Sequence, residues 1–131
     1  MRYLISFITV SLLVLSCTKP NHTPEGPTDV RIRNNTDLDF SNVLVDTGGG
    51  SYNFGDIAAR TETSYHRFEK AYPDAEITLF IGGEEYTTGE QDYTYATYIG
   101  PDKITYLVYI EQPELKKLGV DVILEGPIDD K

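Results

Sequence analysis

Residues 75–88, with the sequence AEITLFIGGEEYTT, indicate how this chain folds. The first seven of them are rich in β-branched and aromatic side chains, which suit the pleated surface of a strand. Gly82-Gly83 is typical of the two-residue turn of a hairpin. Residues 84–88 then return with a second strand-like pattern. The stretch therefore predicts a β-hairpin.

Short runs of the same kind recur over residues 28–125, separated by Gly, Pro, Asn and Asp. Val30 and Ile32, for example, alternate with charged residues, as in a half-buried strand. Residues 113–119 fit either one helical turn or a hairpin connection. The spacing predicts an all-β domain, namely an antiparallel β-sandwich of the immunoglobulin-like type, with a small antiparallel β-barrel as the alternative. The other expected strands are residues 28–33, 40–45, 51–57, 63–68, 93–99, 104–110 and 120–124.

The charge of the chain bears on its partners. Its 131 residues include 11 Lys and Arg against 21 Asp and Glu, giving a formal net charge of −10. Such a surface repels nucleic acid and the anionic face of a membrane, so nucleic acid is not an expected partner. A single cysteine excludes an internal disulfide, and the domain must therefore be held together by packing.

The N-terminal segment has the layout of a secretory signal peptide. Arg2 supplies a positive charge, residues 3–15 are mostly apolar, and Ser16 precedes the only cysteine, Cys17. A membrane-spanning helix needs about 20 apolar residues, so this segment is too short to be one. We therefore expect residues 1–16 to be a signal peptide.

The residues that follow predict a tether and then the domain. Residues 18–27 contain three prolines and a glycine and no apolar side chain, which is typical of a linker. The expected organisation is a modified Cys17 and flexible tether over residues 17–27, the β domain over residues 28–125, and a charged tail over residues 126–131.

The segment Val14-Leu15-Ser16-Cys17 resembles the lipobox of bacterial lipoproteins. The resemblance implies that the Cys17 thiol receives a diacylglyceryl group and that the signal is cut before this cysteine. Fatty acyl groups, palmitate among them, then anchor the chain, so membrane lipid is the expected partner of Cys17. Two or more chains suffice for stable anchoring. The implied location is the bacterial cell envelope. Thr18 after the cysteine is not an obvious retention signal, which favours the outer membrane, on its periplasmic or its surface face.

The domain also resembles a group of small lipoproteins from Bacteroidota-type bacteria. The likeness rests on turn and strand residues, and it implies export and membrane anchoring without supplying catalytic residues. The segments that carry it are RNNT at 33–36, DFSNV at 39–43, GG at 49–50, YNFGDI at 52–57, residues 64–68 and AY at 71–72.

The first candidate functional segment is Asp46-Thr47-Gly48, which is similar to the active-site turn of aspartic proteases. That chemistry needs two aspartates that share a proton, so a chain with one copy would have to form a homodimer. The alternative is that residues 46–50, which continue with Gly49 and Gly50, are simply the turn that leaves a strand. In that case the same residues form a possible binding loop.

The second candidate is a row of tyrosines. Strict alternation in the expected strand 93–99 places Tyr93 and Tyr95 on one face and Tyr98 on the other. Exposed tyrosines can stack on a glycan or on an envelope protein. The competing interpretation is that they pair across strands and stabilise the sheet.

No pattern in the sequence predicts a metal, a cofactor or catalysis. The acidic pairs lack the spacing of a calcium loop, and His66 has no second ligand of the kind that zinc requires. The sequence therefore predicts a lipid-anchored envelope protein with a binding or structural role and no enzymatic activity.

Overall fold

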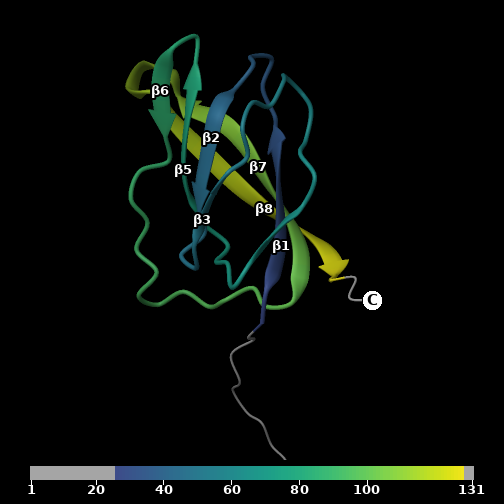
Figure 1. Cartoon of the computed structure of the whole chain (residues 1–131). Helices are drawn as coiled ribbons and strands as arrows, with labels where there is room; N and C mark the ends of the chain where they lie inside the picture. The colour runs from purple at the N-terminus through teal and green to yellow at the C-terminus, as the bar shows by residue number, and fades with distance from the viewer. Residues whose placement is uncertain (1–25, 129–131) are drawn as a thin grey trace, which may run out of the picture.

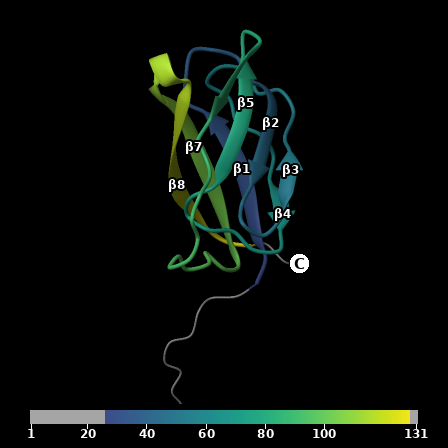
Figure 2. The same ribbon diagram turned by 90° about the vertical axis from the view of Figure 1, so that its left-hand side faces the viewer.

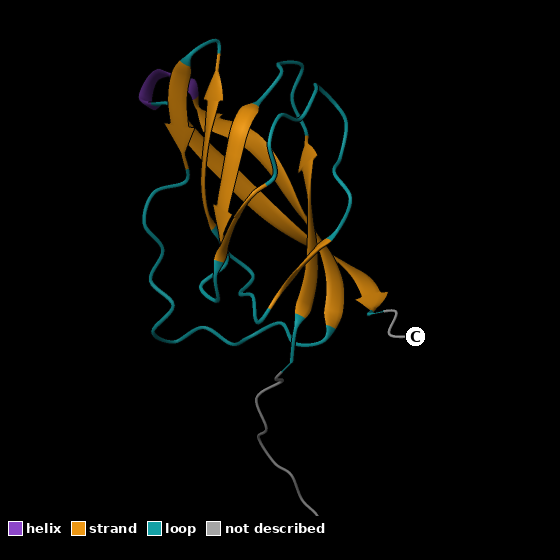
Figure 3. Ribbon diagram, in the orientation of Figure 1, coloured by secondary structure: helices purple, strands orange, loops and turns teal. Residues whose placement is uncertain are grey.

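The computed structural model describes residues 26–128 and consists of strands with one short 3₁₀ helix, so the prediction of an all-β domain is confirmed (Figures 1 and 3). The 3₁₀ helix η1 covers Pro113–Leu115. The strands are β1 (Thr28–Asn34), β2 (Ser41–Asp46), β3 (Ser51–Asn53), β4 (His66–Phe68), β5 (Glu76–Ile81), β6 (Glu84–Thr87), β7 (Asp102–Gln112) and β8 (Lys117–Pro127).

All eight strands form one mixed sheet in the order β3-β2-β5-β6-β8-β7-β1-β4. Two of its pairings, β1 with β7 and β6 with β8, are parallel. The expected antiparallel, immunoglobulin-like sandwich is therefore not confirmed. Parallel neighbours need a long connection, and here most of the domain lies between Asn34 and Asp102. Local alternation in the sequence carries no signal for such a pairing.

The two edge strands of the sheet meet through aromatic rings, and the sheet curls on itself. Tyr52 of β3 stacks on His66 of β4 with 3.5 Å between ring centroids and 11° between the planes. Phe54 packs edge-on against Tyr52, and Phe68 packs edge-on against His66. These contacts bridge strands that have no ladder between them, so the barrel alternative fits this sheet better than the sandwich does.

The core lies inside the curled sheet and follows the alternation of its strands. In β1 the inward residues Val30 and Ile32 are fully buried, while Arg31 and Arg33 are only partly covered. Tyr106 of β7 is the largest fully buried side chain. The remaining buried apolar residues are Phe40, Val43, Val45, Ile57, Phe68, Ala71, Ala75, Ile77, Leu79, Ile104, Val108 and Leu118.

The hairpin predicted at residues 75–88 is present. β5 and β6 pair antiparallel from Thr78 with Thr87 to Ile81 with Glu84. Gly82 and Gly83 both have positive φ, as the turn requires. The second long hairpin, β7 with β8, turns through η1 and Lys116, whose φ of 51° is left-handed. Both interpretations of residues 113–119 thus describe part of the same connection.

Several sequence-based expectations are corrected by the structure. The expected strands 51–57 and 63–68 are shortened to Ser51–Asn53 and His66–Phe68. Residues 93–99 form no strand, because Asp92 accepts hydrogen bonds from the Thr94 backbone and hydroxyl and the Ala96 N–H bonds back to Tyr93 O. Such local bonds compete with a ladder. The charged tail predicted from residue 126 begins later, because β8 continues through Pro127 in pairing with Asp102.

The loops gather at two opposite ends of the domain (Figures 1 and 2). One end carries the connections around residues 35–40 and 58–62, the β5–β6 turn and η1. The other end carries residues 47–50, 69–75 and 88–101, together with Gly26. We call this second end the tether end, because the predicted tether joins the domain there. Cys17 and most of the tether lie outside the described residues.

Candidate functional site

The loop at residues 46–50 leaves β2 in a compact turn at the tether end. The Asp46 carboxylate accepts a hydrogen bond of 2.9 Å from the Gly48 N–H. The Thr47 N–H donates to Gly50 O at 3.1 Å, and the Gly49 N–H donates to the Thr47 hydroxyl at 3.2 Å. A side chain that bonds two residues ahead is the usual signature of an Asx turn. The geometry thus gives Asp46 and Thr47 structural roles in the turn.

The same loop is fastened to the segment that precedes β5. The buried Thr47 hydroxyl donates to Lys70 O at 2.8 Å, and the Tyr72 N–H donates to Thr47 O at 3.3 Å. A Cβ atom on Gly49 would lie 2.6 Å from Lys70 O, and one on Gly48 would lie 2.6 Å from the Tyr72 ring. The glycines at 48 and 49 are therefore needed for close packing.

Two of the three predicted tyrosines meet this loop through Tyr72. The Tyr93 ring stacks on Tyr72 with 4.3 Å between centroids, and the Tyr98 ring lies 4.9 Å from Tyr72 on a tilted plane. The Tyr93 hydroxyl donates to Asp46 O at 3.5 Å. The Lys70 ammonium donates to the Tyr98 hydroxyl at 2.8 Å. We call Lys70, Tyr72, Tyr93 and Tyr98 the tyrosine cluster.

Tyr95 stands apart from this cluster. Its side chain is 98% exposed, while Tyr93 and Tyr98 are partly covered by their neighbours. The predicted aromatic row is therefore divided between one free ring and two rings engaged in packing. Sequence reasoning missed Lys70 and Tyr72, which join the two predicted segments. The signal present was Ala71-Tyr72, one of the segments that carry the lipoprotein resemblance, in which Tyr72 is a large aromatic residue.

The cluster shifts the pKa values of its own groups. Burial raises the pKa of Tyr93 to about 12, and the nearby Asp46 carboxylate adds to the effect. The hydrogen bond with Tyr98 raises the pKa of Lys70, and a hydrogen bond with Tyr98 likewise raises the pKa of Tyr72. Neutral tyrosines beside a charged lysine are therefore the stable arrangement at neutral pH.

The stability of the domain should fall in alkaline solution because of Tyr93. An unfolded tyrosine ionises near pH 10, whereas the pKa of folded Tyr93 is about 12. Between these values the unfolded chain binds fewer protons than the folded chain, so the free energy of unfolding decreases as pH rises. Below about pH 9 both states are neutral and the group has no effect. Urea unfolding across this range measures the decline.

The control for this prediction is the exposed tyrosine of the same segment. Tyr93→Phe should make the alkaline decline shallower without removing it, since phenylalanine has no proton to lose but buried Tyr106, whose pKa is also raised by burial, still contributes. Tyr95→Phe should leave the decline as in the parent chain, because this ring is 98% exposed. A parent-like slope in Tyr93→Phe would contradict the assignment.

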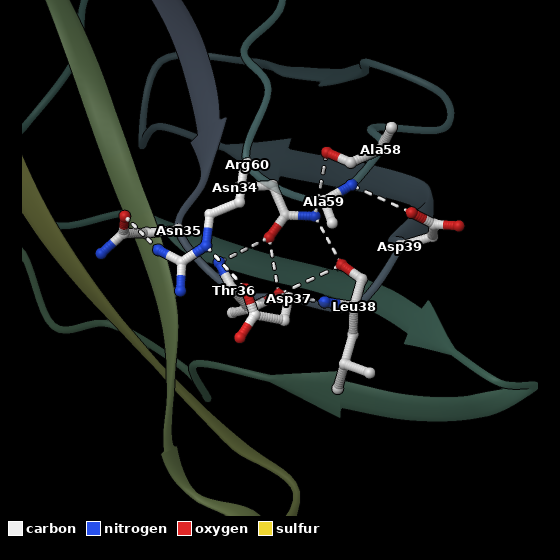
Figure 4. Close-up of polar contacts among 9 residues, drawn as sticks. All are labelled: Asn34, Asn35, Thr36, Asp37, Leu38, Asp39, Ala58, Ala59 and Arg60. Carbon is white, nitrogen blue, oxygen red and sulfur yellow. Dashed lines mark hydrogen bonds and ion pairs between the residues drawn. The ribbon is translucent and has the colours of Figure 1, made fainter.

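A polar centre at the opposite end of the domain was not recognised as such from the sequence. Asn34, the last residue of β1, is fully buried, and its amide nitrogen donates to the carbonyls of Leu38 and Ala58, which are drawn in Figure 4, and to the carbonyl of Ile57. Its side-chain oxygen accepts from the backbone and hydroxyl of Thr36 at 3.0 and 2.7 Å. One side chain thus holds two loops together.

Around this centre the surface is charged and exposed. Arg60 donates to the Asp37 carboxylate at 2.9 Å and to the Asn35 side chain at 3.2 Å, and the Asp39 carboxylate accepts from the Ala59 N–H (Figure 4).

Within residues 26–128 no group of three or more His, Cys, Asp or Glu side chains is placed to hold a metal ion. In the same range no helix has the length and apolar character to cross a membrane.

Comparison with known proteins finds distant structural likeness and no named relative. No protein-family model matches the chain, and no curated protein matches it. The chain is similar to a protein from Eubacterium rectale solved by NMR, at 16% identity and a TM-score of 0.49, over 80% of this chain and 94% of that one. The class of protein rests on the chain's own features, namely a small all-β domain with one curled, mixed sheet.

Proposed function

We propose that the chain is a lipid-anchored protein of the bacterial cell envelope, with a binding or structural role and without catalysis. The observation that carries the proposal is Cys17 at the end of the apolar segment 3–15, in the lipobox-like sequence Val14-Leu15-Ser16-Cys17. Two acyl chains on one cysteine provide a stable hold on a bilayer. No electrostatic attraction between the acidic domain and the membrane is then needed.

The position of Gly26 supports this arrangement. Gly26 lines a surface pocket with Glu69, Lys70 and Tyr98, so the chain enters the domain beside the tyrosine cluster. The nine residues from 17 to 25 reach at most about 30 Å when extended. The tether end would then face the bilayer, and the loops around Asn34 would face away from it. Those loops are where an envelope protein or glycan would be met.

Loss of the anchor should follow from a single substitution. The Cys17→Ala chain should either be absent from the membrane fraction or retain residues 1–16, since no thiol remains to receive lipid. The parent chain, which keeps Cys17, should sediment with membranes. Its intact mass should equal the mass of residues 17–131 plus acyl groups. Membrane fractionation and intact-mass measurement on both chains check this.

The matched control changes the next residue. Thr18→Ala alters the side chain after the cysteine and keeps the thiol, so it should stay anchored with the acylated mass. The proposal is overturned if the parent chain is soluble, or if its intact mass includes residues 1–16.

A further inference from the structure

The curled sheet is closed by aromatic rings at one seam and is open at another. Between β6 and β8 the described pairing is limited to Thr87 with Lys117. Beyond this point β8 runs on to Pro127 with β7 as its only strand partner among the described residues. The ten further residues of β8 therefore present one edge without a strand partner among the described residues. We call this edge, residues 118–127, the free edge.

Leu118 and Gly119 at the start of the free edge are buried, but little covers the side chains near its other end. Consecutive strand residues point to opposite faces, yet Ile123 is 41% exposed and Leu124 is 65% exposed. This end of β8 is thus open on both faces. Val120 and Val122, which pack partly against the core, precede them. A long apolar edge of this kind is a ready template for another strand.

Two surface pockets lie along the free edge. Each is lined by residues of β8 and by residues from other parts of the domain. One is bounded by Ala75 and Thr88 opposite Gly119 and Val120. The other is bounded by Ile99 and its neighbours opposite Val122 and Leu124, and it is mostly apolar. In Figure 3 the loop between β6 and β7 bows out to one side of β8, and residues 97–99 of this loop come back to line the second pocket. The edge is therefore flanked by hollows that can take alternate side chains of an added strand.

The charges around the opening are negative. Asp74 and Glu111 line the first pocket, Asp102 lines the second, and Asp121 lies exposed on β8 itself. None of these four carboxylates makes an ion pair with a described residue, and Lys117 is the one basic side chain that lines either pocket. Asp121 and, less strongly, Glu111 raise the pKa of Tyr109 between them.

We propose that the free edge of β8 binds an extended segment of another protein by β-augmentation, and that this segment alternates apolar residues with Lys or Arg. Backbone hydrogen bonds to β8 would supply affinity, and the two pockets would select the apolar side chains. The four carboxylates complement basic residues on the segment. A second copy of this chain is disfavoured, because it would bring its own Asp121 to the same place and the chain carries a net charge of −10.

The test uses the full chain and a synthetic peptide in which lysine alternates with valine, with both ends blocked. Amide hydrogen exchange is followed with and without this probe. Exchange should slow within residues 118–127 when the peptide is added. A peptide in which glutamate alternates with valine should bind at least about tenfold more weakly, as like charges meet at the edge.

Matched variants locate the contact. Leu124→Lys should weaken binding of the lysine peptide by about tenfold or more, since it places a like charge on the edge and removes an apolar contact. Leu115→Lys is the control, because Leu115 is 66% exposed but lies in η1, away from both pockets. Its affinity should match that of the parent chain. Urea unfolding of each variant verifies that the fold is retained.

A second pair covers the case in which Leu124→Lys does not fold. Asp121→Lys should reduce affinity for the lysine peptide, while Glu114→Lys, exposed in η1, should not. The proposal is overturned if the two peptides bind equally, or if both variants of a pair behave alike. It is also overturned if residues 118–127 become protected without peptide as the chain concentration rises, since the occupant would then be a second copy.

Discussion

Replacing Asn34 by aspartate should destabilise the domain by about 3 kcal/mol or more at neutral pH, because a buried carboxylate would face three carbonyl oxygens. The Asn34 amide nitrogen donates to Leu38 O at 2.7 Å, to Ile57 O at 3.1 Å and to Ala58 O at 3.3 Å. Aspartate keeps the size and the oxygen that accepts from Thr36, but has no donor. Urea unfolding of the variant and the parent chain measures the difference.

The deficit of Asn34→Asp should shrink in acid. A carboxyl group that faces carbonyl oxygens has a folded pKa above its unfolded value of about 3.9. The folded variant then binds more protons than the unfolded variant, so its stability is greatest below the unfolded pKa. That stability is lost as pH rises through both values. Unfolding at about pH 3 compared with pH 7 should therefore show a partial rescue relative to the parent chain.

The neighbouring residue provides the control. Asn35→Asp makes the same chemical change in a residue that is not fully buried and whose side chain accepts from Arg60 at 3.2 Å. Its effect on the free energy of unfolding should stay within about 0.5 kcal/mol. Equal losses in the two variants would contradict the role given to Asn34.

The Asn34 centre illustrates what sequence patterns can and cannot reveal. The sequence Asn-Asn-Thr-Asp at residues 34–37 is typical of a turn, and the bonds between Asn34 and Thr36 are of that local kind. The contacts that make Asn34 a centre reach Ile57 and Ala58, more than twenty residues away. Nothing in a local pattern encodes such a partner. Burial of one particular Asn among several is set by the fold as a whole.

The same limit applies to the sheet. The β5–β6 hairpin was predictable because its turn glycines lie between its two strands. The parallel pairing of Val30 with Ile104 joins residues that are far apart in the chain, and alternation fits a parallel and an antiparallel neighbour equally well. The prediction of a strand at residues 93–99 was wrong because of local contacts rather than distant ones. Their tyrosines suit a strand, but the side chains of Asp92 and Thr94 capture the backbone first.

The candidate site was predicted in its parts but not as a whole. Residues 46–50 and Tyr93 were singled out separately, and the structure places the Tyr93 hydroxyl against Asp46 O. What joins them is the segment from Lys70 to Tyr72, which carries no motif. A run of glycines is typical of a flexible turn, yet a Cβ atom on Gly48 or Gly49 would collide with that segment. Small size and flexibility are not separable in a sequence.

Gly49→Ala should therefore destabilise the domain by about 2 to 3 kcal/mol through overpacking. The added Cβ would lie 2.3 Å from Lys70 Cγ and 2.6 Å from Lys70 O. The side-chain atom can move aside, but the carbonyl is backbone and accepts the Thr47 hydroxyl at 2.8 Å. Relief requires residues 47–49 to move away from Lys70, which breaks that hydrogen bond. Urea unfolding measures the loss, and the near-ultraviolet circular dichroism of the tyrosines reports whether the stacking of Tyr72 on Tyr93 is disturbed.

Two further variants separate backbone overlap from other causes. Gly49→Ala combined with Lys70→Ala should recover only part of the loss, because Lys70 O stays in place when the side chain is removed. Ser51→Ala, at an exposed position of β3 after the same turn, should change the free energy of unfolding by no more than about 0.5 kcal/mol. Full recovery in the double variant would mean that the side chain alone is in the way. In that case the turn at residues 46–50 can shift relative to the tyrosine cluster. The Lys70 side chain, and not the Lys70 backbone carbonyl, would then be what excludes a larger residue at position 49.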